Sequence, residues 1–336
     1  MKRNHRGGRV GRWVSPAALA LCLTGCLDPG EAGGLVPATV EQDRSLPSVE
    51  INGTTVHAEA FGEPDAPLIV MLHSGPGGDY RSLLPYRVLA DDGYRVVFWD
   101  QRGGGLSQRH DADSYQTDQY LEDLREVVDM YTTREDQPLV FLGASWGAMY
   151  ATWFISEYGD YGGRVAGAIL VEPGAFTSEG LEAYLAAGFP PWQVTSEELN
   201  DLLWFAQIMS PRDHERADYM QQLALLAGFP KEHNDPNKHE PAWRSGAVAH
   251  GALLKRVLDE GFDWTRGLND FEPEVLFLRG ALNENMPISH QQELASHFQS
   301  SKIVTVEDVG HQVLWEKQSQ ALSHIRTYLN GLEVQP

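Results

Sequence analysis

A serine flanked by glycines lies near the middle of the chain, in the sequence Gly143-Ala144-Ser145-Trp146-Gly147. An apolar run precedes it and a helical pattern follows. The spacing therefore predicts a sharp strand-to-helix turn that holds the Ser145 hydroxyl clear of the backbone, with small flanking residues that avoid clashes. In such a turn the backbone amide of Trp146 points into the same space and can donate to an oxyanion. The pattern predicts a nucleophile, against the alternative of a glycine-rich loop that only closes a strand.

Two further segments supply the partners that such a serine needs. The sequence His73-Ser74-Gly75-Pro76-Gly77-Gly78 follows a buried apolar run, and the Gly75 amide is predicted as the second oxyanion donor. His73 is interpreted as a structural residue of this turn. His311 comes just after the last predicted strand, so it is predicted as the general base. The chain order serine, acid, histidine is the one that an α/β-hydrolase requires.

The elements that must position these residues alternate along the chain. A hairpin is predicted over 49–61 around Asn52-Gly53. Further strands are predicted over 68–72, 94–99, 138–142, 165–171, 275–278 and 303–306, and helices over 118–131, 149–158, 287–298 and 313–329. This alternation predicts an α/β fold with a mostly parallel sheet. Residues 174–266 interrupt it with helical patterning, and they are too many for a loop, so they are predicted to form an inserted helical lid.

Three motifs together resemble those of the proline iminopeptidase family of α/β-hydrolases. The segment 73–78 is similar to that family's His-Gly-Gly-Pro-Gly-Gly, with Ser74 in place of a glycine. Residues 100–107 read Asp-Gln-Arg-Gly-Gly-Gly-Leu-Ser and match its Asp-Gln-Arg-Gly-x-Gly-x-Ser, while 143–147 resemble its Gly-x-Ser-Trp-Gly. The resemblance covers roughly residues 48–173 and 267–331. We expect the hydrolase core to comprise 48–173 and 267–336.

The resemblance implies a serine hydrolase that removes amino-terminal residues from small peptides through an acyl-enzyme, without a cofactor or metal. Because relatives in the superfamily are esterases or amidases, hydrolysis of small carboxylic esters or amides is the alternative. Residues 100–107 are interpreted as positioning loops around the site. A serine at the turn argues against dehalogenase or epoxide hydrolase chemistry, in which the nucleophile is an aspartate.

The chain departs from the family pattern at the acid of the triad. The family has Gly-x-x-Asp-x-x-x-Pro after the penultimate core strand, whereas residues 280–287 place Asn283 where the aspartate belongs. An asparagine can orient an imidazole but cannot stabilise an imidazolium with a charge. The adjacent Glu284 is the first choice for the acid and Glu172, at the end of the strand 165–171, is the second. Glu172 could instead hold a substrate ammonium, and a non-catalytic binding lipoprotein with a decayed triad is the rival interpretation.

The amino terminus has the pattern of a targeting segment. Residues 1–12 contain five basic and no acidic residues, and the apolar run 13–23 is too short to span a bilayer. The tetrapeptide Leu23-Thr24-Gly25-Cys26 resembles a bacterial lipobox. We therefore predict a signal peptide over 1–25, lipid attachment at Cys26 and an exported, membrane-anchored protein. Leu27, rather than aspartate, follows the cysteine and favours the outer membrane. Residues 26–47 are predicted to be a flexible tether.

Composition excludes several classes of function. With 47 acidic against 26 basic residues, the 336-residue chain has a net charge of −21, which argues against nucleic acid as a partner. Two cysteines cannot build a disulfide scaffold or a cysteine-rich zinc site. His233, Asp235, His239 and Glu240 share a polar segment of the lid, which is interpreted as an exposed loop rather than a metal site. The sequence sets no oligomeric state.

Overall fold

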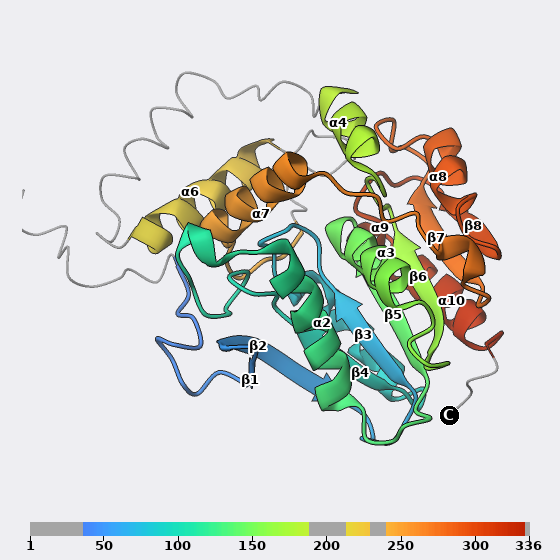
Figure 1. Ribbon diagram of the computed structural model, residues 1–336, viewed down its shortest axis with the longest axis horizontal. Helices are drawn as coiled ribbons and strands as arrows, with labels where there is room; N and C mark the ends of the chain where they lie inside the picture. Colours follow the sequence, from blue (N-terminus) through green and yellow to red (C-terminus); the bar gives the residue numbers. More distant parts are fainter. Residues whose placement is uncertain (1–35, 188–212, 229–239, 333–336) are drawn as a thin grey trace, which may run out of the picture.

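An eight-stranded sheet is the centre of the computed structural model, which describes residues 36–187, 213–228 and 240–332 (Figure 1). The sheet order is β1-β2-β4-β3-β5-β6-β7-β8, with β1, β2 and β4 paired antiparallel and every other pair parallel. The strands are β1 (Ser48–Ile51), β2 (Thr54–Phe61), β3 (Leu68–Leu72), β4 (Arg95–Trp99), β5 (Leu139–Ala144), β6 (Val165–Val171), β7 (Val275–Gly280) and β8 (Ser301–Val306). The predicted mostly parallel α/β sheet is confirmed.

Alternation along the central strands divides the core between the two faces of the sheet, because successive side chains point to opposite sides. On β3, Val70 packs in the same cluster as α2 (Thr117–Tyr131), α3 (Trp146–Tyr158) and α8 (Ile288–Ala295). Its neighbour Met71 packs instead with the 3₁₀ helix η1 (Arg81–Ala90), α9 (Val313–Glu316) and α10 (Gln318–Leu329). The helix predicted over 313–329 is thus two helices that meet at Lys317.

The described parts of the predicted lid contain helices. They comprise α4 (Ser178–Ala187), α6 (Asp213–Gly228) and α7 (Ala247–Glu260), and α6 and α7 lie against each other (Figure 1, yellow and orange). Within the three described ranges, no helix has the length and apolar character needed to cross a membrane. The predicted signal peptide over 1–25 and the lipid attachment site Cys26 lie outside those ranges.

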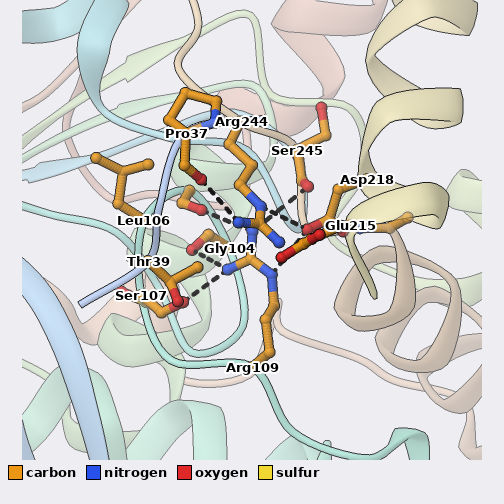
Figure 2. Close-up of polar contacts among 12 residues, drawn as sticks. Pro37, Thr39, Gly104, Leu106, Ser107, Arg109, Glu215, Asp218, Arg244 and Ser245 are labelled. Carbon is orange, nitrogen blue, oxygen red and sulfur yellow. Dashed lines mark hydrogen bonds and ion pairs between the residues drawn. The ribbon is translucent and has the colours of Figure 1, made fainter. Parts of the chain in front are cut away.

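A buried ionic cluster fixes the base of the lid to the core (Figure 2). The Nε atoms of Arg109 and Arg244 lie 3.0 and 2.7 Å from the same Asp218 oxygen, Oδ2, on α6. The other Asp218 oxygen accepts the backbone N–H of Ala247 at 2.9 Å, where α7 begins. Arg109 also donates to the carbonyl oxygens of residues 104, 105 and 107. One carboxylate thereby joins the loop after β4 to α6 and to the start of α7.

The end of the predicted flexible tether is part of this assembly. The side chains of Thr39 and Val40 are buried, and the Val40 N–H donates to the Leu106 carbonyl oxygen at 2.8 Å. The Pro37 carbonyl oxygen accepts a hydrogen bond of 2.7 Å from Nη1 of Arg244 (Figure 2). The prediction of a flexible tether over 26–47 is therefore wrong for residues 37–40, because contacts with distant parts of the chain fix this segment in place.

Replacement of Asp218 with asparagine should loosen the lid. The variant leaves two buried guanidinium groups without their shared carboxylate, a class of change that costs about 3–5 kcal/mol. We expect hydrogen exchange of the α6 amides to accelerate by at least about 100-fold. Asp259→Asn is the matched control, because Asp259 is exposed and pairs with Lys255 within α7. Equal exchange in Asp218→Asn and the control would contradict the structural role of the cluster.

Candidate active site

The predicted serine turn has the expected geometry. Ser145 directly follows β5, has φ +51° and ψ −112°, and is the N-cap residue immediately before α3. Its N–H donates to the Val171 carbonyl oxygen at 2.8 Å, which holds the strained turn against the end of β6. A Cβ atom added to Gly147 would lie 2.0 Å from the Leu72 carbonyl oxygen, and one on Gly143 would lie 2.3 Å from that of Gly147. Both glycines are therefore required by close backbone packing.

The histidine predicted as the base lies in the same pocket as the serine. His311 follows β8, in the segment before α9, and its side chain is 29% exposed. Ser145 and His311 both line a small pocket, together with Glu240 from the lid. Its other lining residues are Ser74, Leu83, Ala144, Val171, Gln312, Leu314 and Trp315. Residues that are 166 positions apart in sequence are thus brought to one pocket at the carboxyl edge of the sheet.

Two of the three candidates for the acid lie beside the imidazole. Oε2 of Glu172 is 3.5 Å from Nδ1 of His311, and Glu172 is fully buried. Asn283 is buried between them, with Nδ2 donating to Glu172 Oε2 and lying 3.5 Å from the same Nδ1. Glu284, the first choice from the sequence, has an exposed side chain. Glu172, rather than Glu284, therefore lies within reach of the imidazole, because the Glu284 side chain is exposed to solvent.

The backbone at Glu172 is also unusual. This residue follows β6 and has φ +51°, a conformation that costs of order 1–3 kcal/mol for a residue other than glycine. Its N–H donates to the Leu278 carbonyl oxygen at 3.0 Å and Oε1 accepts the N–H of Gly280. These bonds hold the chain in a turn that points the carboxylate at the end of β7. Sequence patterns do not display such a turn, which is why Glu172 ranked second.

Hydrogen bonds from a buried histidine organise the glycine-rich loop. Nδ1 of His73 bonds the Ser74 carbonyl oxygen at 2.7 Å, and Nε2 accepts the N–H of Gln101 at 3.0 Å. Burial lowers the pKa of His73, which keeps the imidazole neutral and able to accept. The Gln101 side chain in turn accepts the indole N–H of Trp146 at 2.9 Å. This supports the structural interpretation of His73 and connects the loop to the serine turn.

The same loop presents a different residue to the pocket from the one predicted. Ser74 lines the pocket beside Ser145, whereas the predicted oxyanion donor Gly75 has an exposed backbone at φ +143°. The Ser74 and Gly75 N–H groups are adjacent in this loop, and Ser74 lines the same pocket as Ser145. A donor from this loop is compatible with the fold, and its position is set by the His73 bonds.

Buried carboxylates hold the surrounding loops. Asp100 accepts the N–H groups of Tyr80 and Leu106 at 2.9 and 2.8 Å, which agrees with a positioning role for residues 100–107. Asp79 accepts the N–H groups of Trp243 and Arg244, where the lid returns to the core. Burial, together with the nearby Asp100 charge, raises the pKa of Asp79 to about 7. Folding therefore favours protonated Asp79. The stability that this adds is present at low pH and is lost as the pH rises through about 7.

The described residues contain no group of three or more histidine, cysteine, aspartate or glutamate side chains arranged to hold a metal ion. Of the polar lid residues considered for a metal, His233, Asp235 and His239 lie outside the described ranges. Glu240 is described and lines the pocket of Ser145. From the sequence, Glu240 is interpreted as part of an exposed loop because no helical histidine spacing supports a metal site; its place in this pocket depends on tertiary packing.

Comparisons with known proteins agree with this architecture. The family model described as "alpha/beta hydrolase fold" matches residues 67–318. A proline iminopeptidase of Pestalotiopsis fici is 26% identical over 84% of this chain and 98% of its own length. An AB hydrolase superfamily protein of Bacillus subtilis is 36% identical over 34% of this chain and 39% of that protein. The enol-lactonase structure from Burkholderia xenovorans has a TM-score of 0.57 and 18% identity, covering 84% of this chain and all of that one, so this likeness concerns the fold alone.

Substitution of Gly147 by alanine should destabilise the turn. The added methyl group would contact the carbonyl oxygen of β3 at a distance that no real Cβ adopts, so strand and helix must separate. We expect a loss of at least about 2–3 kcal/mol in the free energy of unfolding, measured by urea denaturation. Gly251→Ala is the matched control, because its Cβ would enter open space on α7 and should stabilise by about 0.5–1 kcal/mol. Similar stabilities for the two variants would rule out close packing as the reason for the glycine.

Proposed function

Because this chain belongs to the α/β-hydrolase family, we propose that it is a serine hydrolase that works through an acyl-enzyme. The observation that carries the proposal is the shared pocket of Ser145 and His311, with the buried Glu172 carboxylate 3.5 Å behind the imidazole. These three residues have the chain order serine, acid, histidine. Each follows a parallel strand, which is the arrangement that supports nucleophilic catalysis in this fold.

In the proposed reaction, the hydroxyl oxygen of Ser145 attacks a carbonyl carbon while Nε2 of His311 takes the hydroxyl proton. The resulting imidazolium donates its Nδ1–H toward Oε2 of Glu172. When the tetrahedral intermediate collapses, the imidazolium proton passes to the leaving group and an ester remains on Ser145. Water then attacks this ester, giving its proton to His311, and the carboxylic acid product leaves. The seryl oxygen recovers its proton from the imidazolium.

Backbone amides would stabilise the oxyanion. The N–H of Trp146 lies at the first residue of α3, where amide groups are not used within the helix and the helix dipole favours negative charge. The loop that holds Ser74 and Gly75 supplies the second donor. Its supporting bonds from His73 and Gln101 are buried, so the amides need little rearrangement when charge develops on the substrate.

An aminopeptidase-type activity on small peptides is the proposed substrate class. The relative from Pestalotiopsis fici is named a proline iminopeptidase, and its alignment with this chain covers 98% of the length of that relative. The pocket supports this choice, because it places one carboxylate, Glu240, beside Ser145. A carboxylate at this place can bind the ammonium group of a peptide amino terminus and orient the adjacent carbonyl toward the serine. Esterase or amidase activity without an amino terminus is the alternative outcome.

Labelling with a fluorophosphonate tests the acyl-enzyme mechanism. The folded protein should be modified at Ser145 at neutral pH, because His311 is placed to accept the hydroxyl proton in the proposed mechanism. Mass spectrometry of the labelled peptide identifies the site, and Ser145→Ala should take up no label. An unmodified Ser145 in the folded wild-type protein would exclude a serine hydrolase and favour a binding protein with this fold.

Substrate comparison tests the role of Glu240. The protein should hydrolyse prolyl- or alanyl-naphthylamide, and Glu240→Gln should lower kcat/KM for this substrate about 10- to 100-fold, mainly through KM. Turnover of p-nitrophenyl acetate, which has no ammonium group, should be unchanged. The control is Glu182→Gln, which removes an exposed carboxylate from lid helix α4. Hydrolysis of the ester alone would exclude the aminopeptidase and leave an esterase.

A further inference from the structure

Asn283 occupies the centre of the contacts between the proposed acid and base. It is 3% exposed and follows β7, where the family pattern has the aspartate of the triad. Its Oδ1 accepts the N–H of Met286 at 3.3 Å. This bond turns the NH₂ group toward Glu172 and His311. Both ends of the amide are therefore used, and the loop after β7 determines which end faces the site.

The orientation of the amide decides what Asn283 can do. An NH₂ group only donates, so it cannot accept the Nδ1–H of His311. Oε2 of Glu172 lies at the same 3.5 Å from Nδ1 and is able to accept that proton. Asn283 instead donates to that same Oε2, while the Gly280 N–H donates to Oε1. The carboxylate is thus held by one donor on each oxygen, and the remaining acceptor position of Oε2 is directed at the imidazole.

Burial makes these donors necessary. Glu172 has no exposed surface, and a buried carboxylate without hydrogen bonds is strongly destabilised in its ionised form. A neutral donor stabilises the charge without cancelling it, whereas a cation would compete with His311 and a second carboxylate would repel. The Asn283 amide is a donor and is neutral, so it neither competes with His311 nor repels Glu172. An aspartate at that place would set two carboxylates in contact.

We propose that Asn283 is a positioning residue, which holds the carboxylate of Glu172 toward Nδ1 of His311 and allows the acid of the triad to come from β6 instead of β7. This inference rests on the proposed serine hydrolase function. It assigns the departure from the family pattern to an exchange of roles: the carboxylate follows β6, and a neutral amide occupies the former place of the acid.

An exchange of the two side-chain types tests the proposal. Glu172→Gln should lower kcat by up to about 10⁴-fold, the loss seen when a triad aspartate becomes an amide. The double variant Glu172→Gln/Asn283→Asp restores one carboxylate and one amide with the charge unchanged. We expect it to recover at least about tenfold of the lost kcat. If the two positions cannot exchange roles, no recovery is expected, so a folded double variant no more active than Glu172→Gln would overturn the inference.

Two single variants keep the proposal testable if the double variant does not fold. Asn283→Ala removes one donor to the carboxylate and should lower kcat about 10- to 100-fold with little change in KM. Asn283→Asp adds negative charge near Nδ1, which favours the imidazolium, so the acidic limb of the pH profile of kcat/KM should move to higher pH. Unchanged kcat in Asn283→Ala, or an unmoved limb in Asn283→Asp, would each count against it.

Glu284→Gln is the matched control, because it removes a carboxylate from the neighbouring residue, which is exposed, and should leave kcat within about twofold. Fluorophosphonate labelling of the wild-type protein distinguishes failure of the proposed function from failure of the role proposed for Asn283. If Ser145 of the wild type is not labelled, the proposed function itself fails. If it is labelled and the double variant shows no recovery, only the role of Asn283 is wrong.

Discussion

The hydrogen-bond ladder between β5, β6 and β7 continues beyond the ends of the strands, and the site depends on this continuation. The N–H of Ser145 donates to the last residue of β6, Val171, and the N–H of Glu172 donates to Leu278 of β7. The turns that carry Ser145 and Glu172 are therefore each fixed by the backbone of the neighbouring strand. Because parallel strands end at one edge, the register of the ladder sets the distances between the functional groups.

The molecule combines a strongly acidic composition with several deeply buried carboxylates. Asp100, Asp123, Glu172 and Asp218 are all fully or almost fully buried, and each accepts hydrogen bonds from two or more donors. Asp100 is bonded by two backbone N–H groups and the His57 ring, and Glu172 by the Gly280 N–H and the Asn283 amide. Arginines pair with Asp123 and Asp218. Arginine guanidinium groups offset the charge of Asp123 and Asp218, whereas the hydrogen-bond donors to Glu172 are neutral amides, which leaves its carboxylate to the His311 imidazole in the proposed mechanism.

The sequence allowed the strands and the serine turn to be predicted, because their signals are local. Glycines around Ser145 and short apolar runs report backbone geometry within a few residues. The acid could not be ranked in this way, since Glu172 and Glu284 are separated from His311 by long stretches of chain and only the tertiary packing decides which carboxylate is buried beside it. The contact of Pro37 with the lid had no local signal either, as its partner lies 207 residues further along the chain.

That contact has a consequence for where the folding unit begins. A chain shortened to the first strand would keep all eight strands, yet the Pro37 carbonyl that receives Arg244 would be missing, as would the buried Val40 beside Leu106. Of the described residues ahead of β1, those at 36–47 form no strand and no helix, yet Pro37 and Val40 hold the base of the predicted lid against the core. A folding unit trimmed to its secondary structure would therefore lose contacts that stabilise it.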